Sequence, residues 1–154
     1  MPELSNEKKP LRIFMSYSHK DEEYKNDLDL HLANLKRQGL IEVWQDRKIS
    51  PGDEWDEAIK QALLESDIVL FFVSPAFMAS RYIWETELPG AFALRAQKKA
   101  VIVPIFVKPV DDADSPFAKL QGLPRDKKPL SGFADRDEGL YQIAKELREL
   151  VSNW

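Results

Sequence analysis

Residues 67–73, DIVLFFV, are the stretch that decides the fold. Six of these seven residues are large and apolar, and the run lacks the polar and apolar alternation of a strand with one wet face. The polar pair Ser74-Pro75 follows it directly. A short continuous apolar run that ends in a turn signal predicts a central strand of a parallel sheet, covered on both faces.

Further strands are predicted on either side of this one in the chain. The candidates are residues 11–16 (LRIFMS), 40–44 (LIEVW) and 100–107 (AVIVPIFV). Pro104 lies inside the last run and indicates an edge position or a bulge, because proline has no N–H for the ladder. Leu130 and Phe133 mark a short fifth strand.

Three helices follow from apolar residues at spacings of three and four. The first covers residues 21–38 and ends at Gly39, a residue that favours helix termination. The second begins near Asp53 and Glu54 and carries an apolar stripe from Trp55 to Leu63. The third covers residues 135–151 and closes the domain.

A fourth helical segment is expected to be interrupted. Ser80 suits its N-cap, but Pro89 and Gly90 fall within its length, so we predict a kink or break near Leu88 and helix again over residues 91–97. Residues 108–128 are rich in Asp, Pro and Gly and are predicted to form an irregular loop with a helical turn around 117–120.

Strands alternating with helices predict an α/β domain, because each parallel crossover returns the chain through a helix. We expect a flavodoxin-like three-layer sandwich whose five-stranded parallel sheet has the order 2-1-3-4-5, with helices on both faces. We expect residues 1–10 to form a flexible lead-in and residues 11–154 to form the domain. Ligands in such sheets bind at the carboxyl ends of the strands, where the order reverses. The loops at 16–20, 44–53 and 74–80 meet there.

Composition excludes several classes of protein. The chain has 154 residues, 44% hydrophobic and 31% charged, which fits one folded domain. The absence of Cys excludes disulfides, thiolate metal sites and a Cys nucleophile. No apolar run reaches the length of a membrane span, and the N-terminus lacks a signal sequence, so we expect a cytoplasmic protein without membrane contact. A net charge of -4 argues against direct nucleic-acid binding.

Known site motifs are also missing. Neither the P-loop pattern nor the dinucleotide-binding glycine pattern occurs. A phosphoacceptor site would need acids where the first and third strands end, and these places hold Ser16 and Ser74. His19 and His31 are the only histidines and have no carboxylate constellation around them, so no metal site is predicted.

Residues 80–88, SRYIWETEL, contain an acid in an unusual setting. Glu87 lies among large aromatic and aliphatic neighbours, and shielding from water is one way in which proteins adapt a carboxylate for chemistry. Glu85 and Glu87 are equally compatible with solvated acids in the first turns of a helix, where they favour its dipole. The topology places this segment beside the rim described above.

Four ordered segments resemble the Toll/interleukin-1 receptor (TIR) domain family, most closely its bacterial type. They are RIFMSYSHKDE (12–22), VWQDRKISPGDEWDEAIKQAL (43–63), SDIVLFFVSPAFMASRYIWETEL (66–88) and KKAVIVPIF (98–106). The likeness runs from Leu11 to Val151. It implies a flavodoxin-like fold, a helix glutamate matching Glu87 that cleaves NAD⁺, and a loop at 45–53 that mediates assembly. Ile83 stands where several enzymatic relatives have Trp, and Ser18 where some have Arg.

The resemblance also identifies the remaining candidate residues. Substrate-binding candidates are Ser16, Tyr17, Ser18, Trp44, Asp46, Ser74, Tyr82 and Trp84. Self-association candidates are Arg47, Lys48, Ile49, Ser50, Pro51, Gly52 and Asp53. Trp44 and Trp84 fit core packing as well as ligand contact, since Trp is buried on average. One carboxylate suffices for the reaction. The nicotinamide ring of NAD⁺ is a cationic pyridinium and departs as neutral nicotinamide, so the leaving group needs no general acid.

Three interpretations remain open at this point. The first is an NAD⁺ glycohydrolase, activated by TIR self-association in bacterial immune or cell-death signalling, with NAD⁺ as substrate and no cofactor. The product is ADP-ribose or its cyclic form, and a fused or partner sensing domain would supply the signal. The second is a non-enzymatic scaffold or adaptor that binds other TIR domains. The third is a nucleoside-transferase-like enzyme with the same sheet, which competition between NAD⁺ and nucleosides would distinguish.

Overall fold

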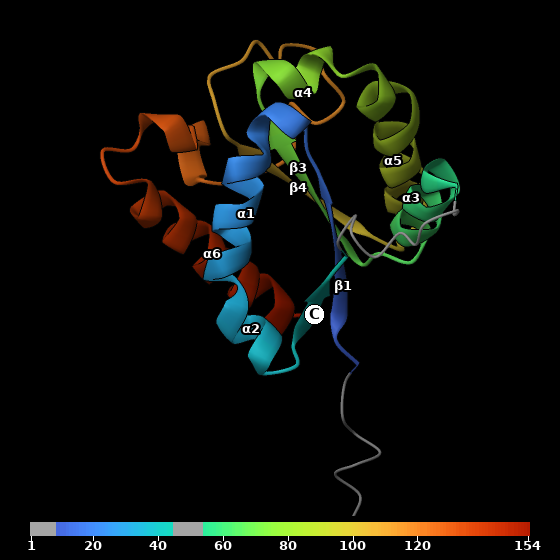
Figure 1. Ribbon diagram of the computed structural model, residues 1–154, viewed down its shortest axis with the longest axis horizontal. Helices are drawn as coiled ribbons and strands as arrows, with labels where there is room; N and C mark the ends of the chain where they lie inside the picture. The colour runs from blue at the N-terminus through green and yellow to red at the C-terminus, as the bar shows by residue number, and fades with distance from the viewer. Residues whose placement is uncertain (1–8, 45–53) are drawn as a thin grey trace, which may run out of the picture.

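The computed structural model describes residues 9–44 and 54–154 and has helices on both sides of a parallel sheet (Figure 1). Within these residues the sheet has four strands in the order β2-β1-β3-β4. They are β1 (Leu11–Ser16), β2 (Ile41–Val43), β3 (Ile68–Val73) and β4 (Val101–Phe106). The first four predicted strands and their order are confirmed.

Strand β3 is the centre of the sheet, as its apolar sequence predicts. All six of its residues are fully buried, because β1 and β4 pair with its two edges and helices cover both of its faces. Ile68 is opposite Ile13 of β1 and Val101 of β4, and Ser16, the last residue of β1, is opposite Phe71. Their carboxyl ends therefore lie at one rim.

Two layers of helices enclose the sheet (Figure 1). On one face lie α1 (Glu22–His31), α2 (Ala33–Arg37) and α6 (Arg136–Ser152). On the other lie α3 (Trp55–Leu64), a π-helical turn η4 (Ile83–Glu87) and α5 (Leu88–Ala96). The short helix α4 (Pro75–Ala79) follows β3. The 3₁₀ helices are η2 (His19–Asp21), η5 (Arg125–Lys127) and η6 (Leu130–Gly132).

The predicted fifth strand is wrong. Leu130 begins the 3₁₀ helix η6, and its side chain is fully buried in the core cluster that contains α6, so its apolar character reflects packing and not strand pairing. The outer edge of β4 instead receives one isolated bridge, from Leu123 to Ile105. Leu123 accepts a hydrogen bond from the Phe106 N–H at 2.8 Å and donates one to the Pro104 carbonyl at 2.8 Å.

Pro104 fits its strand because β4 is an edge. Its carbonyl points away from β3, toward Leu123, so its missing N–H would have pointed the same way. The residues on either side of Pro104 in the alternation, at odd-numbered positions, make the hydrogen bonds to β3. The N–H of Val101, for example, donates to the carbonyl of Asp67. The expected edge position of Pro104 is confirmed.

Two predicted helices differ from the structure in their interior. The first is divided at Leu32, whose φ of -91° and ψ of 0° separate α1 from α2, and it ends before Gly39 with φ of +73°. The helical segment after Ser80 is interrupted near Leu88, as expected, but the interruption is the π turn Ile83–Glu87 and not a break. The Leu88 N–H bonds the carbonyl of Ile83, and Pro89 then occupies the first turn of α5, where a missing N–H is tolerated.

Candidate functional site

A cleft of about 460 Å³ opens at the carboxyl end of β1, beside β3, where the strand order reverses. Three segments line it. Tyr17 to Lys20 come from the loop after β1, Trp55 and Ile59 from α3, and the segment from Ser80 to Glu87 supplies the third wall. The rim predicted from the topology therefore carries a cavity in the structure.

Glu87 is the acid of this cleft. Its side chain is only 8% exposed, and its Oε1 accepts a hydrogen bond of 2.6 Å from Oγ of Ser16, the last residue of β1. That distance is in the range of charge-assisted O–H···O⁻ bonds. Glu85 points elsewhere, as expected: it is exposed and pairs with Arg81 at 2.8 Å. The π turn thus brings one of the two acids against the end of β1.

An aromatic pair forms one wall. The rings of Trp55 and Tyr82 lie 5.0 Å apart between centroids at an interplanar angle of 50°. The Tyr82 hydroxyl donates a 2.7 Å hydrogen bond to Asp56, which also pairs with Lys60 at 3.1 Å. Burial, and after it the hydrogen bond to Asp56, raises the pKa of Tyr82 far above its ordinary value. The same hydrogen bond, and next the one from Lys60, lowers the pKa of Asp56.

Trp55 is a lining residue that sequence reasoning missed. We expected it in the apolar stripe of α3, yet its side chain is 55% exposed and faces the cleft. The available signal was its position in the first turn of a helix that follows a rim loop. A large apolar residue at such a place is a candidate ligand contact, because pockets are lined mainly by apolar and aromatic side chains.

Tyr17 and Ser18 also line the cleft, and both have structural contacts. The Tyr17 ring packs edge-on against Phe72, with 6.3 Å between the ring centroids. The ammonium of Lys25 lies 5.1 Å from the centroid of the Tyr17 ring. The Ser18 hydroxyl accepts the N–H of Lys20 at 3.3 Å and caps η2. These contacts hold the loop after β1 in place beside Glu87.

Ser74 belongs to a different, fully buried cluster. Its hydroxyl donates to Asp21 and accepts the N–H of Phe77 at 3.0 Å, which caps α4. Asp21 is also fully buried, and Lys108 lies 3.6 Å from its second carboxylate oxygen. This cluster joins the loops after β1 and β3. It places Ser74 outside the lining of the cleft.

The two remaining tryptophan candidates also lie outside the lining. Trp44 stacks on Phe14 at 5.7 Å with an interplanar angle of 10°. Trp84 tilts against Phe117 at 6.4 Å, and within the described ranges its Nε1 has no hydrogen-bond partner. Both pack against the apolar cluster on the α3 and α5 face. Asp46 and the loop candidates at 47–53 lie outside the described residues.

Neither a metal-binding cluster nor a membrane-spanning helix occurs among the described residues. Residues 9–44 and 54–154 contain no group of three His, Asp or Glu side chains placed to hold a metal ion. His31 contacts Asp137 at 3.0 Å, and His19 lies edge-on to Tyr17. None of the helices formed by the described residues has the length and apolar character needed to cross a membrane.

Comparison with known proteins gives two matches. Residues 13–144 match the family model described as TIR domain. A protein of Sinorhizobium fredii (strain NBRC 101917 / NGR234), named uncharacterized protein y4lF, is 40% identical over 137 residues. The match covers 89% of this chain and 42% of the relative, so the chain spans less than half the length of that relative.

Proposed function

This chain belongs to the TIR domain family, and from that premise we propose that it cleaves NAD⁺ between nicotinamide and ribose. TIR domains are often NADases. The observation that carries the proposal is the buried carboxylate of Glu87. This residue lines a cleft at the carboxyl end of β1, and its carboxylate accepts a hydrogen bond from Ser16. A cleft of about 460 Å³ is within the usual range for small-molecule sites.

The chemistry requires one acidic group. The bond between ribose C1′ and the pyridinium nitrogen breaks, its electron pair stays with nicotinamide, and positive charge develops on the ribose. Water then attacks C1′ and releases a proton, which gives ADP-ribose; attack by a group of the same molecule gives the cyclic product. In the proposal, the Glu87 carboxylate binds the ribose hydroxyls and stabilises the developing charge. Ser16 holds the carboxylate in position.

We further propose that Trp55 and Tyr82 supply the aromatic surface for a base of the substrate. Ile83 stands where several enzymatic relatives have Trp, and both Ile83 and the Trp55–Tyr82 pair line the cleft. An exposed Trp on a Tyr whose hydroxyl is fixed by Asp56 presents a rigid ring. Stacking contributes about 0.5–1.5 kcal/mol, so Trp55→Ala should raise KM for NAD⁺ by roughly 2- to 12-fold. Trp154→Ala, outside this cleft, is the control.

Chromatography of the products tests the main proposal. Concentrated or artificially assembled protein should release nicotinamide from NAD⁺, and Glu87→Gln should reduce the rate by roughly 10²–10³-fold. Glu85→Gln is the matched control, since Glu85 is exposed and pairs with Arg81. Normal turnover by Glu87→Gln would overturn the assignment of the acid. The same chromatogram separates linear from cyclic ADP-ribose.

Assembly is the second part of the proposal. TIR domains typically self-associate, and we propose that residues 47–53 mediate contact with other TIR domains and that this contact activates the enzyme in a bacterial immune or cell-death response. Pro51→His or replacement of Gly52 should then lower both the scattering mass and the NAD⁺ turnover. Unchanged mass and turnover would contradict a loop-mediated interface. A chain that assembles but releases no nicotinamide would instead be a scaffold or adaptor.

A further inference from the structure

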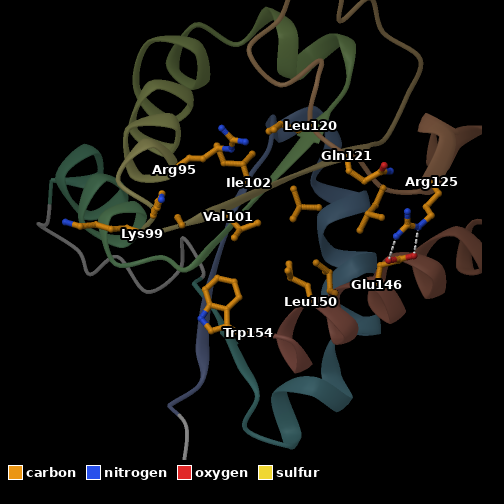
Figure 2. A pocket seen from close by; sticks show the side chains of 15 residues that line it. Arg95, Lys99, Val101, Ile102, Leu120, Gln121, Arg125, Glu146, Leu150 and Trp154 are labelled. Carbon is orange, nitrogen blue, oxygen red and sulfur yellow. Dashed lines mark hydrogen bonds and ion pairs between the residues drawn. The ribbon is translucent and has the colours of Figure 1, made fainter.

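A groove of about 740 Å³ runs along the outer edge of β4, remote from the Glu87 cleft (Figure 2). Its base is formed by Val101, Ile102 and Val103. The end of α5 borders one side and α6 the other. A fifth strand would occupy this position in the sheet order that we expected. In its place, the described residues give the outer edge of β4 a single bridge, from Leu123.

The backbone along this edge is partly free. The amides of Val101 and Val107 point toward β3, whereas the carbonyl of Pro104 and the amide of Phe106 point outward to Leu123. Because successive residues of a strand alternate in direction, the N–H and C=O of Ile102 also point outward. No residue in the described ranges 9–44 and 54–154 supplies a backbone partner to either group of Ile102. The groove therefore offers one donor and one acceptor spaced for an added strand.

The two walls of the groove differ in chemistry. Toward α6 the lining side chains Leu147 and Leu150 are apolar. Toward α5 the lining carries the exposed cations Arg95, Lys98 and Lys99, for which the described residues provide no ion pair. Figure 2 shows Arg95 and Lys99 on the α5 side of the groove, with Leu150 on the opposite side.

Arg125 also lines the groove, beside Glu146 of α6 (Figure 2). Its guanidinium makes two hydrogen bonds to Glu146, at 2.7 and 3.0 Å, so this cation is already neutralised. The unpaired positive charge is thus confined to the α5 wall, although the chain as a whole has a net charge of -4.

We propose that the groove binds an extended segment of a partner protein, which pairs with β4 as an added strand and alternates apolar and acidic side chains. Main-chain bonds to Ile102 would set the register. Because strand side chains alternate between the two faces, apolar side chains would meet Leu147 and Leu150 while carboxylates meet Arg95 and Lys99. This proposal is independent of NAD⁺ cleavage.

The charge of the α5 wall also selects against pairing of this edge with the same edge of a second copy of this chain. Lysine on an exposed edge discourages pairing between identical sheets, because the two edges would bring like charges together. An acidic strand would instead be attracted by the positive charges of this wall. The occupant that fits both the open edge and its charge is therefore a different, acidic segment.

A labelled peptide tests the proposal on the full chain. The probe is an acetylated, fluorescein-labelled peptide of roughly seven residues in which Val and Glu alternate, a length typical of one strand. Fluorescence anisotropy should show saturable binding that weakens with salt. Hydrogen exchange should show new protection of the Ile102 amide. No binding at about 1 mM peptide would overturn the proposal.

Charge-reversal variants test the electrostatic part of the recognition. Lys99→Glu and Arg95→Glu, combined, should weaken binding by about tenfold or more, because each reversal replaces attraction with repulsion. The same variant should gain affinity for a peptide of alternating Val and Lys. Arg37→Glu is the control, since Arg37 is exposed on α2, which packs near β2 at the opposite edge.

Two further outcomes would count against the inference. A peptide N-methylated at the residues that face β4 should not bind; if it binds normally, strand addition is wrong. Protein alone that gains protection at Ile102 as its concentration rises would show that a second copy occupies the groove. Circular dichroism and thermal unfolding establish that the surface variants are folded.

Discussion

The hydrogen bond between Ser16 and Glu87 leads to a quantitative prediction that does not depend on activity. Ser16→Ala removes the hydroxyl that donates to the Glu87 carboxylate at 2.6 Å. The two side chains are 1% and 8% exposed, so water replaces the lost donor poorly. A hydrogen bond to a charged group contributes about 1.5–3 kcal/mol, and losing a buried partner costs a similar amount.

We therefore expect Ser16→Ala to lower the free energy of unfolding by about 2 kcal/mol. For a chain of this size that corresponds to a fall in Tm of about 4–8 °C. In the Glu87→Ala background the same Ser16 change should have little effect, which gives a coupling energy of about 1.5–3 kcal/mol. Glu87→Gln keeps an acceptor but loses the charge, so the coupling should fall to about 1 kcal/mol in that background.

The measurement is a double-mutant cycle by urea denaturation, with the two single variants, the double variant and the wild type. Equal m-values, the slopes of the unfolding free energy against urea concentration, would show that the folded and unfolded states remain comparable among the four proteins. A coupling energy under about 0.5 kcal/mol is the size expected for independent sites. Such a value would refute the reasoning that Ser16 holds Glu87 in place.

Two other predictions concern single side chains. Because burial and then Asp56 raise the pKa of Tyr82, its contribution to stability is fully present below the ordinary value of 10.0 and is lost progressively as the pH rises from there to the raised pKa. The alkaline difference spectrum between wild type and Tyr82→Phe should therefore show no phenolate near pH 10.0, and Asp56→Asn should bring ionisation closer to that value. Separately, Gly139→Ala should introduce an overpacking cost of about 1–3 kcal/mol, because its Cβ would lie 2.8 Å from the side chain of Leu130. The helix gain of about 1 kcal/mol offsets part of this cost, so thermal unfolding should show a net loss of up to about 2 kcal/mol. Gly132→Ala, whose nearest contact is 3.7 Å, is the control. An equal loss in both variants would contradict the packing argument.

Strands were predictable from sequence because their signal is local. The buried run at 67–73 appears as β3 with its start displaced by one residue, and Leu11–Ser16 agrees at both ends. In a parallel sheet covered by helices, hydrophobic continuity alone distinguishes the inner strands. Leu130 shows the limit of that signal, since a buried Leu in a 3₁₀ helix and one in a short strand have the same local sequence character.

The site was less predictable because it depends on which side chains face each other. Ser16 and Ser74 both end strands, yet one contacts Glu87 and the other contacts Asp21. Among the tryptophans, Trp55 lines the cleft whereas Trp84 packs against the core. Linear spacing does not distinguish these cases, because the rotation of a side chain about its helix depends on helix type and on packing with other segments.

The π turn at Ile83–Glu87 has a consequence for the alignment of related chains. A π turn spans one more residue than an α turn, so one residue fewer here would leave an ordinary α-helix and rotate the preceding residues by about 100° relative to Glu87. Tyr82 would then leave the Trp55 side of the helix. Relatives with a plain α-helix should therefore be aligned with a one-residue gap inside this segment. We expect evolutionary change around the glutamate to include insertions and deletions of single residues as well as substitutions.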